Sequence, residues 1–169
     1  MQPKFCSQCG HALESRPVED DHIRPVCPAC GFIVYLNPLI AAGVIATCED
    51  GKIALVLRGE NPGKGLWGFP TGFMEINETV EQAALRECLE ETGLHVELGK
   101  LMGVWSYVHE WKQSSGVLVL YAARVVGGEA RAGSDTVDVR FYTPHEITDA
   151  MLAFETHRDA LQVWKAGLA

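Results

Sequence analysis

The sequence lacks the long apolar run that a membrane-spanning protein needs. Its most hydrophobic stretch, residues 39–48, is about half the length of a membrane-spanning helix. The chain opens on Met-Gln-Pro-Lys rather than on an apolar segment, so we expect no secretory signal. It also lacks internal repeats and low-complexity tracts. These absences argue against a repeat array and against a membrane partner. Together with cysteines that are expected to stay reduced, the soluble composition predicts a cytoplasmic protein.

Positive charge is also scarce. The 169 residues carry 14 lysines and arginines against 22 aspartates and glutamates, which gives a net charge of −8. An acidic surface is repelled by the phosphate backbone of nucleic acids and by anionic membranes, so we expect no broad binding to either. A phosphorylated small molecule can still bind such a protein, because metal ions can supply the positive charge locally.

The familiar glycine-rich nucleotide motifs are missing in any functional form. Residues 63–68 satisfy G-x-G-x-x-G, but Pro70 follows at once and no helix begins there, as a dinucleotide-binding fold requires. The same segment lacks the glycine spacing and the Ser or Thr of a phosphate-binding P-loop. We therefore expect nucleotide recognition through neither motif.

Four of the cysteines that are present form two C-x₂-C pairs. Cys6 and Cys9 are separated from Cys27 and Cys30 by seventeen residues, and a glycine follows each pair. This spacing is typical of a four-thiolate zinc site, and a closed tetrahedral site leaves no position open for a substrate. We predict a structural Zn²⁺ ion that stabilises a module too short to fold alone.

The rest of the chain is long enough for one further domain with a sizeable core, since 47% of the sequence is hydrophobic. Asn37-Pro38 marks a boundary, so we predict a zinc ribbon over residues 1–36 and a second domain over residues 37–169. Asp50-Gly51 predicts a hairpin between the first two strands. The expected strands cover 39–47, 52–57, 98–108, 117–125 and 137–142, and a closing helix covers 154–165.

The segment from Gly72 to Leu94 carries most of the chemistry. It places Glu87, Glu90 and Glu91 within roughly a 100° arc of one helix face. Glu87 and Glu91 are a like-charge i,i+4 pair, which weakens an ordinary surface helix. One interpretation is a solvated charged face. The other is a divalent cation held by the carboxylates, which offsets the repulsion.

Both ends of this helix are marked in the sequence. Asn77 or Thr79 can cap its start, and Gly93 can adopt the left-handed conformation that ends a helix. Acidic residues near the start also favour the positive end of the helix dipole. The side chains expected to pack onto a sheet, on the side away from Glu87, are Leu85, Cys88 and Leu89.

The spacing of the charged residues favours the metal interpretation. The fixed positions are Gly72, Glu78, Arg86, Glu87, Glu90, Glu91, Gly93 and Leu94. Together they resemble the signature box of the Nudix hydrolases, and residues 65–72 resemble that family's approach to its box. Thr71 and Cys88 depart from the usual pattern, but neither removes a charge. The resemblance implies an α/β fold, an α/β/α sandwich with a mixed sheet, here preceded by the small zinc ribbon.

The same resemblance implies an attack of water on a diphosphate that joins a nucleoside to another group, with Mg²⁺ or Mn²⁺ as cofactor. By analogy, Glu87 and Glu91 are the principal metal ligands and Glu90 is a further ligand. Arg86 is expected to hold the acids in place, and Glu78 to fix the preceding loop. These five residues form the expected catalytic group.

The general base stays open at this point. Related enzymes take it either from the box or from a downstream loop, so Glu87, Asp135 and Asp138 are all candidates.

Substrate contacts are expected just ahead of the box. Arg58 and Lys64 are the best protein-borne partners for phosphate, and Trp67 and Gly72 are also expected at the substrate. Several aromatic side chains could stack on a base, although strand aromatics more often belong to the core. They are Trp67, Trp105, Tyr107, Trp111 and Tyr121.

The zinc ribbon helps to indicate which subgroup of the family this chain resembles. NADH pyrophosphatases also carry one, but their Ser-Gln-Pro-Trp-Pro-Phe-Pro stretch is absent here. The chain looks closer to ribbon-bearing enzymes related to FAD and ADP-ribose pyrophosphatases. Hydrolysis of an ADP-linked compound to AMP is therefore the leading expectation. The alternatives are an NADH or NAD-cap pyrophosphatase and a nucleotide-sensing regulator that docks through its ribbon. A homodimer is compatible with the family.

Overall fold

The computed structural model describes residues 3–18, 21–109 and 114–167. The chain divides into two compact units. The smaller comprises Met1–Pro38 with Val108–Ser115, and the larger comprises Leu39–Tyr107 with Gly116–Ala169. The smaller unit contains a two-stranded sheet, and the sheet of the larger unit has seven strands.

The two-stranded sheet is an antiparallel ribbon. It consists of β1 (Glu14–Pro17) and β2 (Ile23–Val26), with Glu14 opposite Val26. Among the described residues before Pro38, the buried side chains are Cys6, Pro25, Val26 and Cys27. So small a core cannot stabilise a fold by apolar burial alone, which fits a module that depends on a metal.

The seven-stranded sheet is mixed. Its strands are β3 (Leu39–Thr47), β4 (Ile53–Arg58), β5 (Trp67–Gly68), β6 (Thr71–Phe73), β7 (Leu94–His109), β8 (Ser114–Gly128) and β9 (Thr136–Tyr142). The main order is β5-β4-β3-β8-β7, with β6 paired to β3 and β9 paired to β4. The β3–β8 pair is parallel, whereas β3 pairs antiparallel with β4 and β6.

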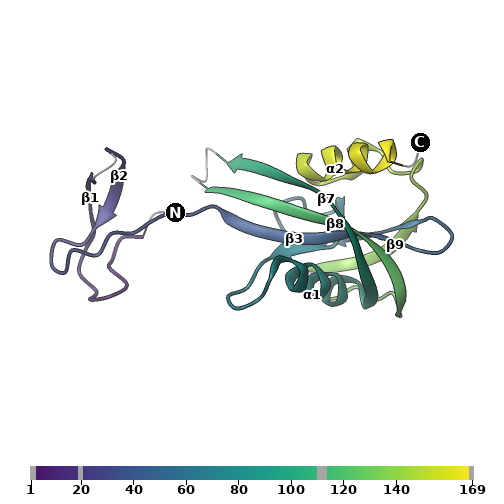
Figure 1. Cartoon of the computed structure of the whole chain (residues 1–169), viewed down its shortest axis with the longest axis horizontal. Coiled ribbons are helices and arrows are strands. Elements are labelled where there is room, and N and C mark those ends of the chain that lie inside the picture. Colours follow the sequence, from purple (N-terminus) through teal and green to yellow (C-terminus); the bar gives the residue numbers. More distant parts are fainter. Residues whose placement is uncertain (1–2, 19–20, 110–113, 168–169) are drawn as a thin grey trace. The chain divides into compact units, whose positions relative to one another are not determined.

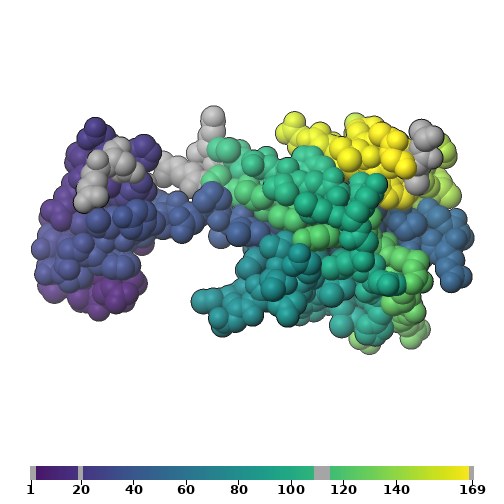
Figure 2. Space-filling model, viewed as in Figure 1, coloured from purple at the N-terminus to yellow at the C-terminus, as the bar shows by residue number. Residues whose placement is uncertain are grey.

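Two helices cover the faces of this sheet. The helix α1 (Val80–Thr92) lies against one face and α2 (Glu155–Ala166) against the other, and a short 3₁₀ turn, η2 (Asp149–Met151), precedes α2 (Figure 1). Figure 2 shows the α2 side chains in yellow and the α1 region in teal at opposite surfaces of the larger unit. This arrangement confirms the α/β/α sandwich with a mixed sheet.

Each face has its own core because strand side chains alternate in direction. On the α2 face the buried residues include Ile45, Leu55, Phe69, Leu118, Leu120, Leu152, Leu161 and Trp164. On the α1 face they are smaller, namely Ala42, Val44, Ala46, Ala54, Ala83, Ala84, Cys88, Leu94 and Ala123. The small side chains let α1 approach the sheet closely.

The ends of α1 follow from its sequence. The Thr79 hydroxyl accepts a hydrogen bond from the Gln82 backbone N–H, and the Gln82 side chain accepts one from the Thr79 N–H, which completes a capping box. Thr79 is therefore the cap, whereas Asn77 lies in the preceding loop with φ 71°. Gly93 ends the helix in the left-handed conformation, also with φ 71°.

The prediction about the packing face of α1 was partly wrong. Cys88 is fully buried, as expected, but Leu85 and Leu89 are 38% and 43% exposed. The face toward the sheet instead contains Ala83, Ala84, Glu87, Cys88 and Glu91. Two box carboxylates thus occupy the stripe that apolar residues usually fill, and this turns the leucines outward.

The expected strands and closing helix are present, with some different limits. The strand expected at 98–108 runs from Leu94 to His109, and that expected at 117–125 runs from Ser114 to Gly128. Sequence reasoning missed β5 and β6, because two- and three-residue strands around Pro70 carry no alternating pattern. In the part of the chain that the structure describes, no helix has both the length and the apolar character needed to cross a membrane.

The end of α1 gives a stability prediction. We expect Gly93→Ala to destabilise the larger unit by at least about 1 kcal/mol, because an L residue in the left-handed region is strained. A Cβ atom there would also lie 2.5 Å from the Glu129 carbonyl oxygen. Thermal or denaturant unfolding measures the effect. Gly127→Ala is the matched control, since a Cβ at Gly127 meets nothing within 4 Å. Equal stability of the two variants would contradict this account.

Candidate metal-binding active site

The backbone of β6 passes directly over the carboxylate of Glu87. A Cβ atom on Gly72 would lie 2.1 Å from Cδ of Glu87 and 2.2–2.3 Å from its two oxygens. Any side chain at position 72 would therefore displace this carboxylate or the strand. Glycine is needed here for close approach, and the result is a narrow cradle of backbone around a buried acid.

Arg86 organises the acidic cluster. Its guanidinium forms a bidentate pair with Glu78, with Nε–Oε2 and Nη2–Oε1 distances of 3.0 and 2.6 Å. Its Nη1 lies 2.6 Å from Oε1 of Glu87 and 3.2 Å from Oε2 of Glu90. Nη2 also donates to the Phe73 carbonyl at 3.0 Å. One cation thus links the loop before α1 to two carboxylates of the helix.

Glu78 contacts both Arg86 and the loop before α1. Besides its pair with Arg86, its Oε1 accepts a hydrogen bond from the Glu75 backbone N–H at 2.5 Å. The Arg86 guanidinium, together with this backbone bond, lowers the pKa of Glu78. Its carboxylate therefore stays ionised and engaged in holding the loop.

Glu91 is the most deeply buried acid of the box. It is 3% exposed, and its Oε2 accepts a hydrogen bond from the Thr71 N–H at 2.9 Å. Burial raises its pKa to about 8; the Thr71 hydrogen bond opposes the shift, and the charges of Asp135 and Glu87 add to it. Within the described ranges, the ion pairs of Arg86 go to Glu78, Glu87 and Glu90, not to Glu91.

The other two helix acids differ in exposure. Burial raises the pKa of Glu87, while the Arg86 hydrogen bond and charge oppose the shift. The side chain of Glu90 is 49% exposed. Buried and exposed carboxylates thus lie along one helix face, with the deepest of them lacking an ion-pair partner in this cluster.

The donor set fits a hard divalent cation. Mg²⁺ and Mn²⁺ prefer carboxylate oxygens, and Mg²⁺ usually completes its shell with water and substrate phosphate. Over the described ranges, the four ribbon cysteines are the only group of three or more potential ligands whose atoms all lie within 4.8 Å of one another. The described box acids are not such a compact group, and carboxylates that held a cation without enclosing it would leave positions open for a substrate.

The segment between β8 and the first residue of β9 is hydrogen-bonded to the C-terminal end of α1. The Thr136 hydroxyl donates to the Glu91 carbonyl at 3.0 Å, and the Arg131 N–H donates to the Thr92 carbonyl at 2.8 Å. These bonds satisfy carbonyls that a helix end leaves free. They also bring Asp135, which precedes Thr136, close enough for its charge to raise the pKa of Glu91.

Asp135 and Asp138, the two candidate general bases that follow the box in the sequence, lie in different surroundings. Asp135 has a half-exposed side chain whose Oδ2 lies 3.5 Å from Nη2 of Arg58. Asp138 lies on β9 and accepts a hydrogen bond from Nε of Arg140 at 2.8 Å. The charge of Asp135 acts on Glu91, whereas the carboxylate of Asp138 is paired with Arg140.

Arg58 lies beside this loop. Its side chain is only 13% exposed, its Nε donates to the Pro62 carbonyl at 2.7 Å, and its guanidinium lies 5.0 Å from the centre of the Phe154 ring. Lys64, the other expected phosphate partner, is exposed. Arg58 is therefore held in place near the box, and one of its terminal nitrogens faces an acid.

The expected stacking residues that the structure describes have several different partners. Trp67 packs edge-to-face with Tyr142 at 5.3 Å, and Arg140 lies 5.5 Å from the centre of its ring. Trp105 packs against the core of the α2 face. The Tyr121 hydroxyl donates to Glu81 at 3.0 Å. Tyr107 is half-buried, and Trp111 lies outside the described residues.

Sequence reasoning missed His157, which lies in the first turn of α2. It is 2% exposed, and its Nδ1 accepts a hydrogen bond from the Phe69 N–H at 3.2 Å. A single histidine in an amphipathic helix belongs to no motif, and it lies 66 positions after Glu91 in the sequence. No local signal could have linked it to the box.

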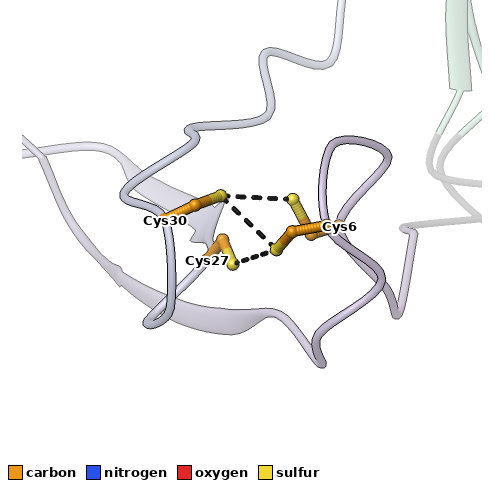
Figure 3. Close-up of side chains that lie close together, drawn as sticks. Cys6, Cys27 and Cys30 are labelled. Atoms are coloured by element: carbon orange, nitrogen blue, oxygen red, sulfur yellow. Dashed lines mark hydrogen bonds between the residues drawn. The ribbon is translucent and has the colours of Figure 1, made fainter.

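The four cysteines of the smaller unit converge on one point. The Sγ–Sγ distances are 3.7 Å for Cys6–Cys30, 3.4 Å for Cys9–Cys27 and 3.5 Å for Cys9–Cys30 (Figure 3). Glycines follow both pairs in the left-handed conformation, Gly10 with φ 76° and Gly31 with φ 77°. Four sulfurs at these distances fit a tetrahedral zinc site.

Comparisons with known proteins agree with this geometry. A family model described as NUDIX domain matches residues 37–163, and one described as Nudix N-terminal, a zinc ribbon, matches residues 4–36. The chain is 35% identical over 137 residues to a protein of Methanocaldococcus jannaschii named ADP-ribose pyrophosphatase, and the match covers 80% of each chain.

Two further relatives extend the comparison. A NUDIX hydrolase structure from Nitrosomonas europaea superimposes with a TM-score of 0.87 at 35% identity, over 99% of this chain and 94% of that one. The NAD-capped RNA hydrolase NudC of Haemophilus influenzae is 31% identical over 121 residues, which is 70% of this chain but 44% of NudC. The chain belongs to the Nudix hydrolase family and carries the N-terminal zinc ribbon found in part of it.

The pKa of Glu91 predicts how stability depends on pH. A carboxyl whose pKa rises from about 4.5 to about 8 on folding stabilises the protein below pH 4.5, and this contribution is lost as the pH rises through 8. In zinc-loaded protein without Mg²⁺ or Mn²⁺, we expect the melting temperature to fall between pH 6 and pH 9. Glu91→Gln should flatten this dependence and should not destabilise the protein at pH 9. A Glu91→Gln variant that melts lower than wild type at pH 9 would contradict the assignment of this shift.

The cysteine cluster predicts zinc content. Purified protein should contain about one zinc per chain by elemental analysis, and Cys27→Ser should lose most of it, since each thiolate supplies one of four ligands. The ribbon should then become sensitive to protease, because its core is too small without metal. Cys48→Ser is the matched control, because Cys48 follows β3 in the larger unit and is not one of the four clustered cysteines. Full zinc content in Cys27→Ser would rule out the four-thiolate site.

Proposed function

We propose that this Nudix hydrolase cleaves an ADP-linked diphosphate such as ADP-ribose or FAD, giving AMP and a phosphorylated product. The observation that carries the proposal is the buried Glu91 carboxylate, which shares a helix face with Glu87 and Glu90 and is not among the acids that Arg86 neutralises. The similarity to an ADP-ribose pyrophosphatase over 80% of both chains supports this choice of substrate.

The carboxylates would hold the cofactor. Mg²⁺ or Mn²⁺ bound by Glu87, Glu90 and Glu91 would neutralise the diphosphate and lower the pKa of the attacking water. Thr71 orients Glu91 through its amide, and Arg86 orients Glu87 and Glu90 through its guanidinium. This ordering of ligands before substrate arrives reduces the reorganisation needed during the reaction.

Asp135 is our choice among the three candidate bases. Glu87 is engaged by Arg86 at 2.6 Å, and Asp138 by Arg140 at 2.8 Å. Asp135 lies on the loop that closes α1, and its contact with Arg58 is longer, at 3.5 Å. In the proposed reaction Asp135 accepts the proton of the attacking water, and Arg58 contacts a phosphate. We also propose that Trp67 and the backbone of Gly72 contact the substrate.

The proposal also covers the domain limits, the cellular location and the assembly of the protein. We propose residues 1–36 as the zinc ribbon, with a structural role for Zn²⁺, and residues 37–169 as the hydrolase domain. A cytoplasmic location fits six cysteines that form no disulfide, four of them proposed as zinc ligands. A homodimer is the proposed assembly on family grounds alone.

The NudC similarity supports one alternative, hydrolysis of NADH or of NAD-capped RNA. The chain spans 44% of the length of that relative. The net charge of −8 disfavours an RNA substrate, because phosphate contacts supply much of the affinity for nucleic acids. A nucleotide-sensing regulator is the remaining alternative, and it predicts nucleotide binding without turnover.

A substrate panel tests the proposal. We expect Mg²⁺-dependent formation of AMP from ADP-ribose or FAD, with little product from NADH or nucleoside triphosphates, when products are resolved by chromatography. Glu91→Gln should lower turnover by about 100-fold or more, because the charge stabilisation supplied by a metal is worth several kcal/mol.

The panel also separates the alternatives. Dominant cleavage of NADH would favour the NudC-like activity. No product from any of the compounds would contradict hydrolysis of ADP-linked diphosphates and favour the regulator. Asp135→Asn should lower kcat with little change in KM if Asp135 is the base, and Asp138→Asn is its matched control.

A further inference from the structure

His157 lies behind the active-site backbone, on the α2 side of the sheet. Its ring packs between two aromatic rings, with centroids 5.4 Å from Phe69 and 5.2 Å from Phe154. A Cβ atom on Gly68 would lie 3.1 Å from Nδ1 of His157, so the β5 backbone is in close contact with the imidazole. The ring therefore has little freedom to move without displacing the strand.

Both ring nitrogens face the segment that leads into the box. Nδ1 accepts the Phe69 N–H at 3.2 Å, so the proton of the neutral ring is on Nε2. Nε2 in turn lies 3.5 Å from the Thr71 hydroxyl oxygen. Burial, with the charge of Arg58 as a smaller cause, lowers the pKa of His157 to about 3, which keeps the ring neutral.

Residues 69–72 also contact two of the box acids, Glu87 and Glu91. The Thr71 N–H donates to Glu91 at 2.9 Å, and Gly72 lies against the carboxylate of Glu87. Thr71 and Gly72 face Gly43 and Ala42 of β3 across the sheet. Residues 69–72 thus form a bridge with His157 at one end and two carboxylates at the other.

We propose that His157 is a positioning residue for the metal site: through Phe69 and Thr71 it fixes the backbone that orients Glu91. This inference rests on the proposed function. An apolar residue could fill the same space without the cost of burying an imidazole, so histidine adds the hydrogen bond to the Phe69 N–H and the contact with the Thr71 hydroxyl. Hydrogen-bond partners behind metal ligands commonly tune metal affinity by 10–100-fold.

The test measures Mn²⁺ binding to zinc-loaded protein by electron paramagnetic resonance, together with kcat. His157→Leu has a similar volume and no acceptor, and it should weaken Mn²⁺ binding by about tenfold. His157→Asn keeps an acceptor near the position of Nδ1, so it should bind Mn²⁺ within about threefold of wild type. His157→Gln places its amide nearer to Nε2 and should behave more like the leucine variant.

Leu161→Ala is the matched control, because Leu161 is fully buried in the same helix and its side chain makes no hydrogen bond. It should lower the melting temperature and leave the Mn²⁺ dissociation constant unchanged. In wild type, ¹⁵N chemical shifts of His157 should report a proton on Nε2 and none on Nδ1.

Three results would overturn the inference. The first is a folded His157→Leu variant that binds Mn²⁺ as tightly as wild type, and the second is equal weakening of Mn²⁺ binding in His157→Leu and Leu161→Ala. If His157→Leu does not fold, the third is equal Mn²⁺ affinity of the His157→Asn and His157→Gln variants. If wild type itself neither binds Mn²⁺ nor hydrolyses substrate, the proposed function fails and the inference fails with it. Binding and turnover in wild type separate these cases.

Discussion

The close approach of the β6 backbone to two buried carboxylates is the constraint on which the site depends. Gly72 has no room for a side chain above Glu87, and the Thr71 amide is bonded to Glu91. A helix can bring acids this near to a strand only if its other contacts are small. The alanines on the inner face of α1 meet that requirement, while Leu85 and Leu89 lie on its exposed side.

The charges of the cluster are balanced only in part. Arg86 contacts three carboxylates, and the most buried acid, Glu91, is not one of them. Burying a carboxylate without a counter-charge is unfavourable, and the protein without a divalent cation responds by raising the pKa of Glu91. A protein with a net charge of −8 can nevertheless attract an anionic diphosphate if the cation is held at this one place.

Local patterns predicted much of this structure, and contacts between distant segments account for what they missed. The limits of α1 and the convergence of the cysteines follow from spacing within one helix and one ribbon, so the sequence was sufficient for both. The outward turn of Leu85 was not foreseen, because solvent is the expected place for Glu87 and Glu91. His157 could not be found either, since its link to Thr71 spans 86 positions and depends on how α2 packs.

The central claim is that the acidic face of α1 holds a divalent cation. Anomalous diffraction from crystals of zinc-loaded protein soaked in Mn²⁺ tests it most directly. We predict a manganese peak bounded by carboxylate oxygens of Glu87, Glu90 and Glu91, in addition to a zinc peak among the four cysteines. A structure with bound Mn²⁺ elsewhere and none at these carboxylates would contradict the account.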